Sequence, residues 1–127
     1  MRALGRFGRA TDGASAAEFA IILPFLMTIL FGIFEFGRAL WVQGVLDYAV
    51  EQAARCATVN ATTCGTASAI RTFASQQTSP LNLATGIFTV STPSCGNQVA
   101  ASYPFTFMAT GLFTYNITLT STSCYPI

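Results

Sequence analysis

The chain has 127 residues, of which only 9 % are charged, and its formal net charge is +1. It contains no histidine, which excludes catalytic sites built on a histidine base and metal sites built on histidine ligands. No basic stripe follows the N-terminus, so we expect no nucleic-acid partner. We also expect no cofactor. This length accommodates one small domain in addition to a membrane span.

Charged side chains are confined to the first part of the chain. All eleven lie at or before Arg71, and the 56 residues that follow carry none. A domain that is free in water normally carries many more surface charges. We therefore expect the C-terminal part to be shielded by partners or to sit in an assembly.

The first residues, MRALGRFGRATD, form a basic leader with three arginines and one aspartate. The five charged residues between 35 and 55 sum to −1. Because arginine accumulates on the cytoplasmic side of membranes, this asymmetry predicts a cytoplasmic N-terminus and an exported C-terminal part.

An almost uninterrupted apolar run extends from Phe19 to Phe34. Its sixteen residues include eleven Leu, Ile or Phe, and Thr28 is the only polar side chain. Sixteen helical residues extend about 24 Å, and continuation to Trp41 reaches the far interface, which predicts one membrane span over about residues 19–41. The apolar residues favour insertion by roughly 3 to 7 kcal/mol, against about 3 kcal/mol for one carboxylate. A carboxylate at position 18, the entrance of the span, is therefore tolerable. Its energetic cost still suggests that Glu18 has a function.

A secretory signal peptide is the alternative for a basic segment followed by an apolar one. The run is slightly long for that purpose, and it continues into a helix with Glu18 at its entrance. Arg38 also lies inside the small-residue site, 37–39, that a signal peptidase would use. These features favour a retained anchor.

Pro24 lies inside the predicted span. It has no amide hydrogen for the carbonyl of Ala20, so we expect a bend or a local opening of the helix. Two interpretations stay open: a tolerated kink, and a joint that lets the subunit leave the bilayer.

The helical pattern continues from Leu40 to about Cys56. One side is apolar and comprises Val42, Leu46, Ala49, Val50, Ala53 and Cys56. The opposite side carries Asp47, Glu51 and Arg55, and the last two are spaced for a weak, exposed ion pair. This period of 3.6 predicts an amphipathic extension, so that residues 14–56 form one helix of about 65 Å.

The remaining residues, 57–127, change in composition. Residues 56–64 are expected to form a short loop and 67–76 one or two helical turns, and strands are predicted at 86–92, 98–108 and 114–122. Gly111 is one of the residues that separate the strands. Pro104 interrupts the middle strand, which predicts an edge position or a break in two. The predicted fold class is α+β: a long transmembrane and amphipathic helix, then a small antiparallel β-rich domain packed on its exported part.

Four cysteines, Cys56, Cys64, Cys95 and Cys124, all follow the span. An even number on one side of a membrane predicts disulfides in an oxidising compartment, whereas the absence of a CxxC pair argues against zinc. Three pairings are possible. Sequence order favours Cys56 with Cys64 and Cys95 with Cys124, each worth about 2 to 4 kcal/mol.

The segment Gly13-Ala-Ser-Ala-Ala-Glu18-Phe19 stands between the basic leader and the apolar helix. It resembles the processing site of type IV pilin-like precursors. The resemblance implies that a membrane prepilin peptidase cuts after Gly13, removes residues 1–13 and leaves Ala14 as the new N-terminus, with Glu18 at mature position five. The new ammonium group would then offset the Glu18 carboxylate at the lipid boundary.

Residues 13–55 are similar to the TadE-like family of pseudopilins, minor pilin-like proteins of the tight-adherence (Flp) pilus. The most specific elements are Glu18-Phe19, Leu23-Pro24, Glu35-Phe36-Gly37-Arg38 and Ala54-Arg55. The resemblance implies a pilin-like fold and a role in pilus assembly, adhesion and biofilm formation. It also implies three kinds of partner: the prepilin peptidase, other pilin-like subunits and the inner-membrane assembly platform. The protein would cross the bacterial inner membrane with its C-terminal domain in the periplasm, and either stay there or enter the pilus.

The alternative function is that of an uncleaved, single-pass membrane protein whose periplasmic or surface domain binds a partner. In that case Gly13 and Glu18 have no special role, and the chain keeps Met1. An enzyme has the least support, because no histidine, lysine or acid lies beyond Glu51 to activate a serine or threonine.

Overall fold

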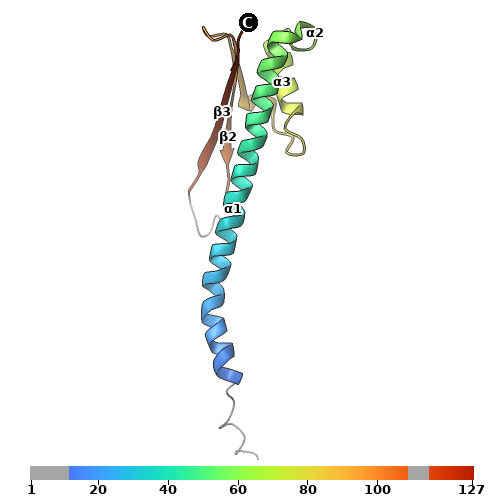
Figure 1. Ribbon diagram of the computed structural model, residues 1–127. Coiled ribbons are helices and arrows are strands. Elements are labelled where there is room, and N and C mark those ends of the chain that lie inside the picture. The colour runs from blue at the N-terminus through green and yellow to red at the C-terminus, as the bar shows by residue number, and fades with distance from the viewer. Residues whose placement is uncertain (1–11, 109–114) are drawn as a thin grey trace, which may run out of the picture. The chain divides into compact units, whose positions relative to one another are not determined.

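The computed structural model describes residues 12–108 and 115–127, so most of the predicted leader, residues 1–11, lies outside the described residues. The helices are α1 (Asp12–Val59), α2 (Ala61–Cys64), α3 (Ala67–Gln76) and the short 3-10 helix η2 (Thr85–Ile87), and the strands are β1 (Phe88–Ser91), β2 (Asn97–Phe105) and β3 (Ile117–Tyr125) (Figure 1). The chain divides into two compact units, Met1–Phe36 and Gly37–Ile127. A long apolar helix followed by a small antiparallel sheet confirms the predicted α+β class.

The helix α1 is continuous over 48 residues and runs through Pro24 (Figure 1). The carbonyl of Pro24 accepts a hydrogen bond of 2.8 Å from the hydroxyl of Thr28, one turn later. This bond satisfies the only polar side chain of the apolar run within the helix itself. Pro24 therefore does not end α1, although it cannot donate to the carbonyl of Ala20.

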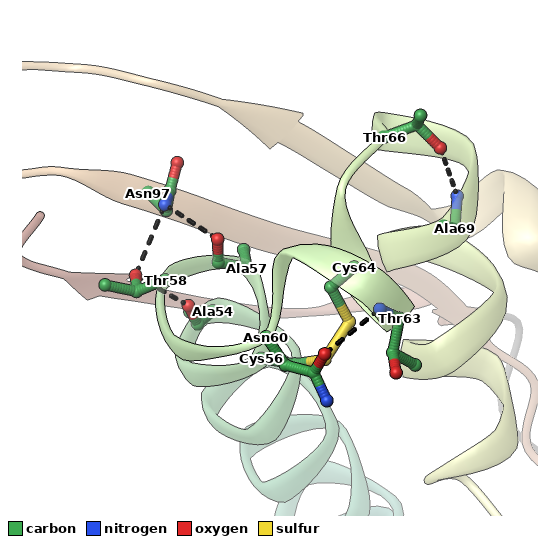
Figure 2. The surroundings of a disulfide bond; sticks show 10 residues. All are labelled: Ala54, Cys56, Ala57, Thr58, Asn60, Thr63, Cys64, Thr66, Ala69 and Asn97. Carbon is green, nitrogen blue, oxygen red and sulfur yellow. Dashed lines mark hydrogen bonds between the residues drawn. A yellow bond between two sulfur atoms is a disulfide. The ribbon is translucent and has the colours of Figure 1, made fainter.

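The segment after Cys56 is more helical than the predicted loop. The helix α1 continues to Val59, and Asn60 then starts α2 by accepting a hydrogen bond of 3.1 Å from the Thr63 amide. Thr66 starts α3 in the same way, with an acceptor distance of 3.2 Å to the Ala69 amide (Figure 2). These side-chain caps explain the difference, because they satisfy amides that the first turn of a helix leaves unpaired.

The core of the Gly37–Ile127 unit lies between one face of the sheet and the helices α1 and α3. All six apolar positions predicted on the extension of α1 are buried, whereas Asp47, Glu51 and Arg55 are exposed. Ile70 and Ala74 of α3 complete the helical side. The sheet contributes Phe88, Val99, Ala101 and Phe105, each at most 3 % exposed.

The sheet has the strand order β1-β2-β3 and is antiparallel throughout. The first strand is shorter than predicted, and the third is shifted toward the C-terminus; Gly111 and Thr114 lie outside the described residues. Side chains alternate, so the face opposite the core is polar. Its exposed polar members are Thr89, Ser91, Ser102, Thr118, Thr120 and Thr122, and Pro104 is exposed on the same face.

The prediction for the middle strand is wrong, because β2 is central and unbroken. The strand β1 pairs only with residues 98–101 of β2, whereas β3 pairs along all nine of its residues. At Pro104, β2 therefore has a partner strand on one side only, among the residues that the structure describes. A proline is tolerated there because the side without a partner needs no amide donor.

Two disulfides close the unit, with the pairing that sequence order favours. Cys56 is bonded to Cys64, which ties the end of α1 to α2 (Figure 2). Cys95 is bonded to Cys124, which ties the turn before β2 to the last part of β3. The two bonds thus hold both ends of the small domain to its core elements.

Gly96 is required by the turn between Cys95 and β2. Its φ is +125°, and a Cβ there would lie 2.1 Å from the backbone oxygen of Tyr125. We expect Gly96→Ala to destabilise the domain by at least about 2 kcal/mol, because both the φ angle and the contact are unfavourable for alanine. Guanidinium unfolding of the full chain in detergent measures this effect.

Gly86 provides the matched control, because it has no atom within 4 Å of the Cβ position and no positive φ. The variant Gly86→Ala should unfold at the same guanidinium concentration as the wild type. Equal midpoints for the two variants would contradict the role assigned to Gly96.

Candidate processing and assembly site

The residues predicted to carry processing lie in the first turns of α1. From Gly13 to Phe19 every side chain is exposed, and Phe19 is 59 % exposed. No atom lies within 4 Å of the position that a Cβ would take on Gly13. Packing within the chain therefore does not require a glycine at this position.

Glu18 is exposed on the second turn of α1. Its carboxylate makes no hydrogen bond or ion pair with any residue in the described ranges. In the uncleaved chain the nitrogen of Ala14 is a peptide amide, so it carries no charge. The structure therefore shows the Glu18 carboxylate in the uncleaved chain. The ammonium group of Ala14, which the resemblance implies as its partner, does not exist before cleavage.

The apolar run of α1 is uncovered. Only 6 % of the most apolar 18-residue stretch of α1 is buried. The helix is long and apolar enough to cross a membrane. Twelve large side chains between 19 and 36 are 41–71 % exposed; they are Phe19, Ile21, Ile22, Phe25, Leu26, Met27, Ile29, Leu30, Phe31, Ile33, Phe34 and Phe36. A surface of this size is stable only in a membrane or against other proteins, which supports membrane anchoring.

Arg38 connects α1 to the end of the central strand. Its Nη2 donates a hydrogen bond of 2.5 Å to the carbonyl oxygen of Thr106. Its guanidinium carbon lies 4.3 Å from the centre of the Phe105 ring, a cation–π contact. Phe107 packs edge-on against Phe105, with 5.2 Å between the ring centres. Arg38 therefore holds the last residues of β2 on the helix.

A second polar contact lies one to two turns further along α1. The side-chain amide of Gln43 donates 3.0 Å hydrogen bonds to the Asp47 carboxylate and to the backbone oxygen of Thr120 in β3. The helix thus binds both β2 and β3 through backbone oxygens. Because the acceptors are backbone oxygens, these two contacts require a particular path of the backbone and no particular side chain at positions 106 and 120.

The contacts of Arg38 were not predicted from the sequence, in which it stands out only within residues 37–39 and the Glu35-Phe36-Gly37-Arg38 element. Glu35 is 7 % exposed, in contrast to the exposed Glu18, Asp47 and Glu51. The Glu35-to-Arg38 element and the aromatic segment 103–107 were available signals. Neither segment by itself shows that Arg38 contacts the end of β2, because 68 residues separate Arg38 from Thr106.

The ion pair predicted between Glu51 and Arg55 is not formed. Neither side chain has an oppositely charged partner within 4.0 Å among the residues that the structure describes. Both side chains are exposed, where such a pair contributes only a few tenths of a kcal/mol.

Within the described ranges, no three His, Cys, Asp or Glu residues are grouped to hold a metal ion, and all four cysteines are in disulfides. The features that stand out are instead an exposed processing-type segment, an uncovered apolar helix and a small domain fixed to that helix. Together they define an α+β protein in which one helix of the described residues, α1, is long and apolar enough to cross a membrane.

A family model described as TadE-like protein matches residues 13–55. The match begins at Gly13 and ends at Arg55, so it contains the exposed segment, the apolar run and the extension of α1 but not the sheet. It confirms the predicted resemblance and supports involvement in a Tad pilus system, with association to a membrane and to pilus subunits. Comparisons with curated proteins and with solved structures gave no match.

We expect Arg38→Gln to lower the free energy of unfolding of the domain by about 1 to 3 kcal/mol, because it removes the cation–π contact and the hydrogen bond to Thr106. Denaturant unfolding and amide hydrogen exchange of the β2 peptide measure the loss. Faster exchange should appear at the end of β2 first.

Arg71→Gln is the control, because Arg71 is an exposed arginine of α3 in the same unit. Unfolding midpoints and exchange rates that are the same for both variants would show that Arg38 does not anchor β2.

Proposed function

We propose that this chain is a pilin-like subunit of a Tad pilus, processed by a prepilin peptidase after Gly13 and required for pilus assembly, adhesion and biofilm formation. The observation that carries the proposal is the family match, which begins at Gly13 and continues through the whole apolar run. In this proposal residues 1–13 are the leader, residues 14–56 form the assembly helix with a span over about 19–41, and residues 57–127 form the exported domain.

The position of Gly13 supports processing, because it is the second residue of α1. The first turn of a helix has amides without intrahelical partners, so it opens at low cost. A protease needs an extended substrate, and the exposed small residues from Gly13 to Ala17 offer no side-chain contacts that would resist it. The Gly13–Ala14 bond is therefore accessible to a peptidase at the membrane surface.

Glu18 acquires its function in this proposal only after cleavage. The new ammonium group of Ala14 would lie four residues before the Glu18 carboxylate, on the same side of the helix. The cation neutralises the carboxylate within one subunit or reaches the carboxylate of a neighbouring subunit in a helical stack. Either pairing lowers the cost of moving a charge into the bilayer or into a filament.

The two disulfides support export of the domain that contains them, because such bonds persist in the oxidising periplasm and not in the cytosol. The arginines of the leader favour the opposite, cytoplasmic side for the N-terminus. The proposed location is thus the bacterial inner membrane with a periplasmic C-terminal domain, before any transfer of the subunit to the pilus. The partners in this proposal are the peptidase, other pilin-like subunits and the assembly platform.

Cleavage is tested in cells that contain the prepilin peptidase of the Tad system. We expect N-terminal sequencing of the wild type to begin at Ala14, Gly13→Ala to be cut or slowed, and Gly13→Leu to remain uncut because a bulky side chain blocks the narrow peptidase site.

Gly32→Leu is the control for this series, because it makes the same change at a glycine of α1 with open surroundings. It should be processed normally. Recovery of Met1 in the wild-type protein would favour the uncleaved, membrane-anchored binding protein and overturn the proposal.

The pairing of Glu18 is tested by Glu18→Gln, which keeps the shape of the side chain and removes its charge. We expect normal cleavage but at least about tenfold less pilus sheared from the cells, because an unpaired buried ammonium costs about 3 to 5 kcal/mol. Glu51→Gln, at an exposed carboxylate of the extension, should leave piliation unchanged. Normal piliation of Glu18→Gln would remove this carboxylate from the mechanism.

A further inference from the structure

Two hollows of about 340 Å³ each lie beside each other where α1 ends and α2 and α3 begin. They share the side chains of Thr63 and Phe73. The first continues along α3 to Gln76, and the second continues along α1 to Gln52. Because they share a wall, we describe them together as the α1–α3 groove.

The lining of the α1–α3 groove is mixed, because Ala69, Phe73, Cys56 and Val59 lie among hydroxyl and amide groups that act as donors and acceptors. The side-chain amides of Gln52 and Gln76 make no hydrogen bond to the described residues, and neither does the Thr63 hydroxyl. These groups face solvent and are available to a ligand. Arg55 is the one charged side chain of the lining; the exposed Glu51, one turn earlier on α1, lines neither hollow.

Phe73 gives the α1–α3 groove an apolar element. Its side chain is half-buried, packs against the core on one side and lines both hollows on the other. An aromatic ring in this position offers the C–H groups of a ligand a surface with partial negative charge. An apolar ring bordered by amides, hydroxyls and one guanidinium suits a ligand that has both C–H faces and polar edges.

The walls of the α1–α3 groove are held in place by covalent and hydrogen bonds. The disulfide between Cys56 and Cys64 joins α1 to α2 (Figure 2), and Cys56 lines the second hollow. The oxygen of the Asn60 amide is occupied by the Thr63 backbone, which leaves the nitrogen of Asn60 as a free donor (Figure 2). A site fixed in this way loses little conformational entropy when it binds.

We propose that the α1–α3 groove binds an acidic saccharide, that is, a sugar chain containing uronic acid residues. The C–H face of one ring lies on Phe73, its hydroxyl groups exchange hydrogen bonds with Gln52, Thr63 and Gln76, and its carboxylate pairs with Arg55. The planar guanidinium binds a carboxylate through two parallel hydrogen bonds, and the absence of an acid in the lining avoids repulsion. A neutral sugar would lack that pair.

This proposal goes beyond the processing and assembly role and does not depend on it. The groove belongs to the Gly37–Ile127 unit, and binding can be measured on the full chain before or after removal of a leader. Failure of cleavage therefore leaves the saccharide site in place, and failure of saccharide binding leaves the processing site in place.

The test is calorimetric titration of the full chain, in detergent micelles, with trigalacturonate and with the neutral trisaccharide cellotriose. We expect trigalacturonate to bind at least about tenfold more tightly, the difference that one charge-assisted hydrogen-bonded pair supplies. Absence of binding at millimolar trigalacturonate, or equal binding of the two saccharides, would overturn the proposal.

Variants locate the binding within the groove. Arg55→Gln should abolish the preference for trigalacturonate, and Phe73→Leu should weaken binding of both saccharides about tenfold while retaining apolar volume in the core. Arg71→Gln, an exposed arginine that does not line the groove, is the matched control and should bind as the wild type does. Arg55 is exposed, so its variant tests the site even if Phe73→Leu fails to fold. Binding that neither Arg55→Gln nor Phe73→Leu alters would place the saccharide elsewhere.

Discussion

The constraint on which this structure depends is an apolar helical surface that the chain does not cover. From Phe19 to Phe36 twelve large apolar side chains of α1 are exposed, so their burial must come from lipid or from other proteins. The features that flank this run are those expected for a helix that lies in lipid or among other proteins. The small residues and Glu18 precede it, and the polar contacts of Arg38 and Gln43 follow it.

The second half of α1 has a different task, because it supplies the apolar face on which the sheet folds. Alanines at 49, 53 and 54 are fully buried in the core that this helix shares with the sheet. The domain is small, and its last 56 residues have no charge. It therefore relies on this helix, two disulfides and hydrogen bonds from the side chains of Arg38 and Gln43 to backbone oxygens. In the proposed function, a domain fixed to the assembly helix in this way moves with it.

The two proposals place different chemistry at the two ends of α1. The first turns carry a carboxylate that gains a partner only when a peptide bond is cut, which makes assembly conditional on processing. The last turns carry Gln52 and Arg55 toward the α1–α3 groove, where the disulfide Cys56–Cys64 fixes the wall. A subunit of this kind would combine assembly through one end of its helix with recognition of an acidic saccharide at the other.

The sequence by itself determined the features that depend on neighbours along the chain. The apolar run, the amphipathic period from Val42 to Cys56 and the helix at 67–76 follow from local spacing, and the segment from Gly13 to Phe19 follows from residue order. Only the tertiary structure decided that β2 is central despite Pro104, that Arg38 meets Phe105 and Thr106, and that Phe73, Thr63 and Arg55 share a groove. The physical reason is that these contacts join residues far apart in the chain, and the pairing is selected by packing and backbone hydrogen bonds that no local pattern records.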